Sequence, residues 1–586
     1  MTFEGWVTLA TVVVLLVVLA REMVPAAFAV LAATIFLLVV GVIDADQAFS
    51  GFSNEAPIIV AALLVFARAA DVSGLLQPVL GRVMAHEGSQ RGLLARVLFP
   101  LTLASGLLNN TTIVAMSIPA VVDACHRLGL SPSRFLMPIS FAAVLGGVIT
   151  LIGTSTNLTV SGLLVDAGHP PLSFFELTPV GLPIALVGVV VLILVTGRLL
   201  PDRGRLGGEP SIGRDYSVSM VVQRDGALVG RTVEQAGLRQ LRSVYLVAIE
   251  RDGTRIAPVS PQTELHERDV LTFVGAVDQI VDLQRTRGLI STQRGQIKQL
   301  PGDRHTFNEV VLGEPFVGRT LKEIGFRARY GAAVLAIHRA GQRIEGKLGE
   351  LPLRMGDTLL VLADETFYPR FRDAGDFLVI APLGGIPPTQ PRKAKRVALI
   401  GFAFIVLTGT GVLPILHGSL LVALAVIGSR ALTLQQARQA IDLNIVVLIG
   451  AAFGLGAAVH TSGVGQVIAD ALVTGLQPFG LIGALAGVLI ATMIITEFIS
   501  NNAAAVLLFP VALATAATLN VDPRPFVIAV ALGASLSFLT PLGYQTNMMV
   551  YGVGNYRFGD FIRLGLPLNL ACVVLSLVLI PMFFPF

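Results

Sequence analysis

Long apolar runs alternate with short polar loops along most of the chain, and they form two blocks on either side of one polar region. An apolar run of about 20 residues is long enough to cross a bilayer as a helix. Such runs predict membrane spans at 5–20, 24–43, 56–70, 179–200, 397–413, 418–431, 445–465 and from 564 onwards. The pattern therefore predicts an α-helical polytopic membrane protein with a polar insertion at about 203–396.

One apolar region in each block is interrupted by adjacent polar side chains. The regions 93–122 and 480–515 break at Asn109–Thr112 and Ser500–Asn502, and each half is too short to cross the bilayer. Because irregular backbone inside a membrane must be buried within protein, we expect two re-entrant hairpins with buried tips.

A second region in each block contains a polar break that begins with glycine. The regions 135–165 and 526–552 break at Gly153–Asn157 and Gly543–Asn547. Each region is long enough for one crossing, so we expect one crossing made of two half-helices in each block.

The two blocks repeat one another at a nearly constant offset. Asn110 and Asn501 are 391 residues apart, and Gly153 and Gly543 are 390 apart. Each repeat is predicted to have five crossings plus a hairpin, and the insertion must return the chain to the side that it left. The two repeats are therefore predicted to be inverted relative to each other.

Basic residues lie almost entirely in the loops on one predicted side of the membrane. The opposite loops hold a single basic residue, Arg524. By the positive-inside rule the basic side is cytoplasmic. We expect a multi-pass protein of the plasma (inner) membrane, with a cytosolic insertion and both termini outside. The net charge of +4 needs no nucleic-acid partner, because this bias in the loops produces it.

The insertion is itself a repeat, with an offset of 88 residues. Val229–Thr232 and Val317–Thr320 both read VGRT, and each begins a predicted helix, at 232–240 and 320–328. The frame continues with Gly237 and Gly325, Gly253 and Gly341, and Asp269 and Asp357. Short β-like runs surround these residues. The two copies resemble the TrkA-C domain, which is the C-terminal lobe of regulator-of-potassium-conductance proteins.

These boundaries predict four domains along the chain. They are a first transmembrane repeat at 1–203, two α+β TrkA-C lobes at 204–295 and 296–390, and the inverted second repeat at 391–586. No strand followed by G-x-G-x-x-G occurs in 203–396, so nucleotide sensing by the insertion is not expected.

The polar breaks are the candidate binding site. The N-termini of half-helices present positive partial charge to an anion, while unwound carbonyls coordinate a cation. All the side chains concerned are neutral, which suits an oxyanion that must also be released. The predicted substrate-binding residues are Asn109, Asn110, Thr111, Thr112, Ser500, Asn501, Asn502, Thr156, Asn157, Thr546 and Asn547.

At these breaks the sequence resembles the divalent anion/sodium symporter family of the ion transporter superfamily, whose hairpin tips read Ser-Asn-Thr. The tips here are Asn109-Asn110-Thr111 and Ser500-Asn501-Asn502. The half-helix loops depart from the family at Ser155-Thr156 and Gln545-Thr546, where prolines are usual.

The resemblance implies a homodimeric, sodium-coupled importer with an elevator-type cycle, and members with paired TrkA-C insertions are often assigned to sulfate. Sodium is then the coupling ion and no other cofactor is expected. The residues that it implies for the two sodium sites are Asn110, Gly153, Ser155, Asn501, Gly543 and Gln545.

Several alternatives stay open at this level. Asn and Thr in membrane helices can simply form hydrogen bonds with neighbouring helices. Two such clusters that are related by the repeat offset, each paired with a glycine-broken crossing, argue against that. Glu497, three residues before the second tip, is either a coupling residue or a structural acceptor. The other functions considered are a dicarboxylate/sodium symporter, a proton-coupled oxyanion or arsenite exporter, and a cation channel regulated by the TrkA-C lobes. No nucleophile–base set indicates an enzyme.

Overall fold

The computed structural model describes residues 1–21, 24–75, 83, 89–128, 130–202, 216–224, 226–238, 244–251, 254–256, 259–275, 288–291, 305–339, 342–344, 348–354, 356–364, 367–371, 376–383 and 391–586. Gly253 and Gly341, and the predicted domain boundaries at 203/204, 295/296 and 390, lie outside the described residues.

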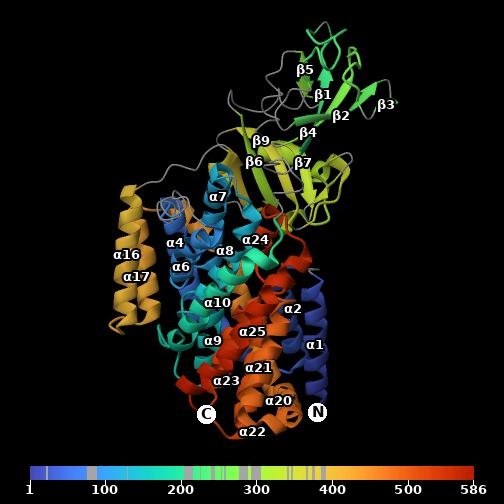
Figure 1. The fold of residues 1–586 in the computed structure, drawn as a ribbon. Helices are drawn as coiled ribbons and strands as arrows, with labels where there is room; N and C mark the ends of the chain where they lie inside the picture. Colours follow the sequence, from blue (N-terminus) through green and yellow to red (C-terminus); the bar gives the residue numbers. More distant parts are fainter. Residues whose placement is uncertain are drawn as a thin grey trace.

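The first block has a helix at each predicted span, and its two interrupted regions are each split into a helix pair at the polar break (Figure 1). The helices are α1 (Phe3–Ala20), α2 (Ala26–Val40), α3 (Ala45–Ser53), α4 (Glu55–Ser73), α6 (Gln90–Ser105), α7 (Asn110–Leu128), α8 (Leu136–Gly147), α9 (Ser155–Asp166) and α10 (Thr178–Leu199).

The second block is built in the same way, with helix pairs at its hairpin and at its broken crossing. Its helices are α16 (Pro391–Gly409), α17 (Ile415–Gly428), α18 (Leu434–Ala440), α19 (Leu443–Thr461), α20 (Val464–Leu476), α21 (Gly480–Thr496), α22 (Asn501–Leu519), α23 (Arg524–Ser535), α24 (Gln545–Val553) and α25 (Phe558–Phe583). Among the described residues, six helical stretches are long and apolar enough to cross a membrane, as a multi-pass protein requires.

Three helices, α3, α18 and α20, lie where the hydropathy pattern predicts loops. Helices α3 and α18 each begin at a capping box, in which Asp44 and Thr433 cap the first turn. These two helices are short, at 9 and 7 residues, so hydropathy alone does not detect them. Capping signals in the sequence mark both of their starts.

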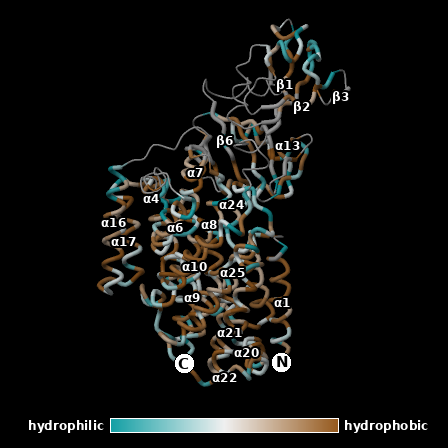
Figure 2. Tube along the Cα trace, viewed as in Figure 1, coloured by the Kyte–Doolittle hydropathy of each residue, from teal (hydrophilic) through white to brown (hydrophobic). Residues whose placement is uncertain are grey.

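The helices pack as two groups. The inner group consists of α6–α10 and α21–α25, and the outer group is built around α1–α4 and α16–α19, with α20 packed between them. Both chain termini lie at the end of the bundle opposite the two sheets (Figure 1). The helices are largely apolar along their length, whereas polar segments gather at the bundle ends and over the sheets (Figure 2).

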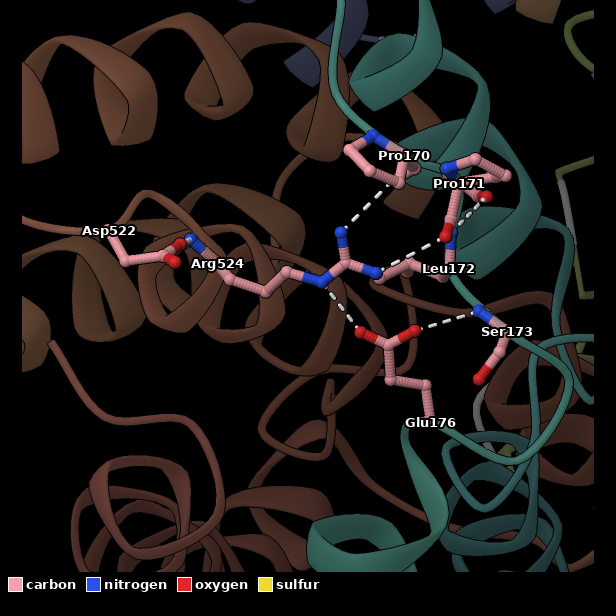
Figure 3. Close-up of polar contacts among 8 residues, drawn as sticks. Pro170, Pro171, Leu172, Ser173, Glu176, Asp522 and Arg524 are labelled. Carbon is pink, nitrogen blue, oxygen red and sulfur yellow. Dashed lines mark hydrogen bonds and ion pairs between the residues drawn. The ribbon is translucent and has the colours of Figure 1, made fainter.

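The two halves of the inner group are joined near the start of α23, at the end of the bundle that holds the termini (Figure 1), by the polar contacts drawn in Figure 3. The Arg524 guanidinium donates to Glu176 at 2.6 Å and also reaches the carbonyls of Pro170 and Pro171. Asp522 accepts from the Arg524 backbone N–H at 2.7 Å. Arg524 is the single basic residue of the loops predicted to lie on the non-cytoplasmic side. It ties the start of α23 to the loop before α10.

The insertion forms two five-stranded antiparallel sheets. Lobe 1 contains β1 (Tyr216–Val222), β2 (Val244–Arg251), β3 (Thr254–Ile256), β4 (Val270–Gly275) and β5 (Leu289–Ser291), in the order β3-β2-β4-β1-β5. Lobe 2 contains β6 (His305–Leu312), β7 (Ala333–Arg339), β8 (Gln342–Arg343), β9 (Thr358–Asp364) and β10 (Phe377–Leu383), in the order β10-β6-β9-β7-β8. Strands β6 to β10 correspond in sequence to β1 to β5, and with this correspondence the strand order of lobe 2, read backwards, is the strand order of lobe 1.

The predicted helices of the lobes need correction. Within 232–238 the backbone forms turns, and residues 239–240 lie outside the described part. The stretch 320–328 is broken into α13 (Leu321–Ile324) and α14 (Phe326–Tyr330) at Gly325, where φ is +61°. A helix cannot continue through this left-handed conformation, which glycine adopts at little cost. Lobe 2 also holds a short helix, α15 (Phe367–Phe371).

The repeated aspartates anchor equivalent ion pairs in the two lobes. Asp357 has no exposed side-chain surface and accepts from the Nε and Nη2 of Arg339, each at 2.8 Å, and from the backbone N–H of Arg354. Asp269 makes the same bidentate pair with Arg251 in lobe 1. A carboxylate this deeply buried needs such partners, since an unpaired buried charge is costly.

We expect Asp357→Ala to destabilise lobe 2 by about 2–3 kcal/mol, because it leaves the Arg339 guanidinium without its carboxylate. The measurement is amide hydrogen exchange of β7 and β9 in the full-length protein. Arg224→Ala is the matched control, because Arg224 pairs with Glu267 at 3.8 Å with both side chains largely exposed. Arg224→Ala should change the free energy of hydrogen exchange by less than about 0.5 kcal/mol. Unchanged protection in Asp357→Ala would contradict this structural role.

Candidate functional site

The two hairpin tips are held by the same pair of hydrogen bonds. In the first, the Ser105 hydroxyl lies 2.7 Å from Asn110 Oδ1 and 2.8 Å from the carbonyl oxygen of Ala143. In the second, the Thr496 hydroxyl lies 3.0 Å from Asn501 Oδ1 and 2.8 Å from the carbonyl oxygen of Ala534. Each hydroxyl thus fixes the central Asn of its tip against the first half of the broken crossing in the same block.

Each break in a crossing is bridged by the Asn at its end. Asn157 Nδ2 donates to the carbonyls of Gly147 and Thr150 at 3.2 and 2.9 Å. Asn547 Nδ2 donates to the carbonyls of Ser537 and Thr540, both at 3.2 Å. Both Asn side chains are fully buried. In this conformation, therefore, their amide groups stabilise the broken backbone from within.

Glu497 accepts hydrogen bonds from the second break. Its Oε1 accepts the backbone N–H groups of Phe538 and Leu539, and its Oε2 accepts that of Thr540, all at 2.9 Å. The residue is only 4% exposed. Of the two roles that the sequence left open, this geometry matches the structural acceptor, because one carboxylate satisfies three unwound N–H groups.

Hydrogen bonds also connect each tip with the broken crossing of the opposite block. Asn110 Nδ2 donates to the Tyr544 hydroxyl at 3.0 Å, just before α24 begins. In the other direction, Asn502 Nδ2 donates to the Ser155 hydroxyl at 3.2 Å at the start of α9. Through these contacts the N-termini of α7, α24, α22 and α9 meet in one region.

Two glycines of the first block are required by close approach at this region. A Cβ on Gly147 would lie 2.6 Å from Asn110 Nδ2, and one on Gly153 would lie 2.5 Å from the carbonyl oxygen of Gly147. In the second block, a Cβ on Gly543 would lie 2.0 Å from Ser537 Oγ and 3.0 Å from Glu497 Oε2. The glycines that mark the two breaks in the sequence are therefore places where backbone and side chain must approach each other directly.

Some polar atoms at the site are buried without a hydrogen-bond partner among the described residues, and two of them belong to Asn side chains. These two are Asn501 Nδ2, at the second tip, and Asn157 Oδ1, at the first break. A buried unpaired donor costs about 1–3 kcal/mol, so an orphaned amide at a tip marks a place where a ligand can bind.

The other predicted residues take less central positions. Asn109 is partly buried and its side chain accepts from the backbone N–H of Thr111 at 2.9 Å. Ser500 is exposed at the start of α22, and Thr112 is partly buried on α7. Thr111 Oγ1 lies 3.5 Å from Gln545 Oε1. The buried hydroxyl of Thr156 lies 3.5 Å from that of Thr154.

Sequence reasoning placed Tyr544 within the second break without naming it as a binding residue, and it missed Ser140. The Ser140 hydroxyl lies 2.9 Å from Thr546 Oγ1 and 2.8 Å from Asn547 Oδ1, so α8 supports the second break. Tyr544 had a signal, because it lies directly beside the Gly543 landmark. Ser140 had none, because its partners follow more than 400 residues later in the chain.

The region is electrically almost neutral. Apart from Glu497, each of the contacts described here is made by hydroxyl, amide or backbone groups. Among the described residues there is no cluster of three or more His, Cys, Asp or Glu side chains that could hold a metal ion. A cleft lined by Asn109 and Ser155 separates the first tip from Val60, Leu64 and Ala67 of α4.

Comparison with known proteins identifies the family. The citrate transporter family, CitMHS, matches residues 14–523, which is most of the chain. The chain belongs to this family. Its members and relatives are transporters rather than enzymes, and the resemblance to anion/sodium symporters of the ion transporter superfamily is confirmed. The assignment of the inserted lobes to TrkA-C stays a prediction.

Relatives extend over nearly the whole length. A putative sulfur deprivation response regulator of Chlamydomonas reinhardtii is 33% identical over 96% of this chain and 99% of its own. Sodium/sulfate cotransporter 1 of the same organism is 24% identical over 91% of this chain and 84% of its own. The solved YdaH transporter of Alcanivorax borkumensis is 14% identical, covers 98% of both chains and has a TM-score of 0.42.

We expect Glu497→Gln to lower the stability of the detergent-solubilised protein by about 1–3 kcal/mol, because the amide group turns a donor towards a backbone N–H. The measurement is the unfolding temperature without added ligand. Gln466→Ala is the control, since Gln466 is an exposed side chain on α20 whose bonds to Asp470 and Thr518 lie at the surface. An unfolding temperature unchanged by Glu497→Gln would refute the role as acceptor.

Proposed function

We propose that the protein is a sodium-coupled importer of a small divalent oxyanion, with sulfate as the expected substrate. The observation that carries the proposal is the meeting of four helix N-termini around neutral tips. It is supported by a relative that is named as a sodium/sulfate cotransporter. The cited hydrogen bonds from Asn110 to Tyr544 and from Asn502 to Ser155 bring these N-termini together.

The chemistry of the site fits an oxyanion. Helix N-termini direct unpaired N–H groups and positive partial charge towards a bound anion without adding a fixed cation. The amide Nδ2 of Asn501 is buried and available as a donor. Because the donors are neutral, the anion is held by replaceable hydrogen bonds and can leave on the other side. The buried Asn157 and Asn547 act in this proposal mainly by shaping the loops.

The proposed sodium sites lie on the two breaks. The residues are Asn110, Gly153 and Ser155 in the first block, and Asn501, Gly543 and Gln545 in the second. Sodium is a hard cation that binds oxygen ligands, which unwound carbonyls and amide oxygens supply. The carboxylate of Glu497 lies beside Gly543 and would favour a cation there.

A driving cation is required by the membrane potential. Moving a dianion into a cell at −100 mV costs about 4.6 kcal/mol, at about 2.3 kcal/mol per charge. Two sodium ions entering with each anion would cancel this charge term, and their concentration gradient would drive uptake. Without a coupled cation, the membrane potential would drive the dianion out of the cell rather than into it.

The repeat and the transport cycle belong to the same proposal. The tip and break hydrogen bonds recur at offsets of 390 or 391 residues, as expected for two inverted repeats. In an elevator cycle the inner group would move against the outer group. The proposal includes a homodimer in the plasma (inner) membrane, with the sheets on the cytoplasmic side and both termini outside.

Uptake of labelled sulfate into proteoliposomes should rise at least about tenfold when an inward sodium gradient replaces an equal potassium gradient, because only sodium fills the proposed sites. The measurement is the initial rate at fixed internal volume. Equal rates in sodium and potassium would refute sodium coupling.

Further arms of this assay separate the alternatives. Citrate and dicarboxylates test the carboxylate substrates that the family description favours. A pH gradient without sodium tests the proton-coupled exporter, for which Glu497 would be the coupling residue. Ohmic single-channel currents would identify a channel.

Asn110→Ala and Asn501→Ala should each reduce uptake by at least about 100-fold, because each removes the central amide of a tip. Folding is checked by expression and gel filtration. Asn444→Ala is the control, since Asn444 is an exposed side chain at the start of α19, and it should transport at the wild-type rate. Wild-type uptake in both tip variants would remove these residues from the site.

A further inference from the structure

Lobe 2 is packed directly on the helical part through its strand β6. Val311 of β6 is fully buried and belongs to the hydrophobic core of the helices rather than to the core of its own lobe. Leu378 of β10 also packs against this helical core. In Figure 1 the second sheet lies against the ends of α24 and α7. The lobe is therefore seated on the bundle by apolar contact.

The contact with α24 is close enough to require glycine at position 552 of the helix. A Cβ on Gly552 of α24 would lie 2.7 Å from Thr358 Oγ1 and 2.8 Å from the carbonyl oxygen of Gly356. A Cβ on Gly356 would lie 3.0 Å from the sulfur of Met548. Contacts below 3 Å leave no room for a side chain, so any larger residue at 552 must displace the lobe or the helix.

The helices under lobe 2 are the ones that begin at the site. Helix α24 starts at Gln545, and Met548 is one turn further on, roughly 5 Å along the axis. Helix α7 starts at the first tip, Asn110, and packs against β10 at its other end. A helix transmits displacement along its axis, so the seating of lobe 2 sets the position of two site loops.

We propose that lobe 2 is a positioning element of the transport site, which holds α24 through Val311, Gly356 and Thr358 and so fixes the loop at Gln545. The inference rests on the proposed function for its transport readout. It assigns the insertion to the inner group, so that the lobe moves with the site rather than with the outer helices. It also means that a ligand or partner bound by the lobes would act on anion affinity through α24.

The test compares Gly552→Leu with Gly197→Leu in the full-length protein. Gly197 lies near the end of α10, and a Cβ there would meet nothing within 4 Å, so it controls for the effect of a leucine on a helix. Gly552→Leu should raise the KM for sulfate roughly fivefold with a smaller change in the maximal rate, since it disturbs positioning. Gly197→Leu should leave both unchanged.

A readout without substrate separates this inference from the proposed function. Gln545 is exposed, and the native Cys125 and Cys572 are buried, so a maleimide reports on Gln545→Cys. The labelling rate of Gln545→Cys should change at least about threefold in the Gly552→Leu background and stay constant in the Gly197→Leu background. If sulfate is not the substrate, this result still supports the positioning role.

A Gly552→Leu protein that folds and keeps both the wild-type KM and the wild-type labelling rate would overturn the inference. If Gly552→Leu is poorly expressed, Val311→Ala weakens the same contact without added bulk. It should shift KM and labelling in the same direction by a smaller factor, and wild-type values in Val311→Ala would equally overturn the inference.

Discussion

The structure depends on satisfying the polar backbone of two interrupted crossings in the middle of an apolar bundle. Water is absent from the hydrocarbon region, so every exposed N–H and C=O group must find a partner within the protein. Asn157 and Asn547 each donate hydrogen bonds to two backbone carbonyls, and Glu497 accepts hydrogen bonds from three backbone N–H groups. These side chains make it possible to place unwound backbone deep in the bundle, where its free polar groups can contribute to an ion-binding site.

The two halves are alike in their bonds but differ in charge. The tip hydroxyls of Ser105 and Thr496 make equivalent contacts, whereas Glu497 has glycine, Gly106, at the corresponding position of the first block. One break is thus lined by a fixed carboxylate and the other is neutral. This asymmetry means that the two proposed cation sites do not have equal electrostatics, although the surrounding framework repeats.

The insertion is tied to the same framework. Lobe 2 contributes Val311 to the core of the helices and meets α24 where only glycine fits. At the opposite end, Arg524 and Glu176 join the two halves of the inner group. The inner group is therefore fastened at both ends, and a small cleft beside Asn109 lies between its first tip and α4.

The sequence by itself determined the helical spans, the polar breaks and the offset that pairs them, because polar residues are conspicuous in apolar runs and periodicity is local. It also located Asn110, Asn501, Asn157 and Asn547. It could not separate an Asn that faces a ligand from one that bridges its own backbone. It also could not reveal the contact of Tyr544 with Asn110, the role of Ser140 or the Gly552 contact. Only the tertiary structure decided these, because the partners are brought together across the two halves and the insertion, and no sequence spacing records that proximity.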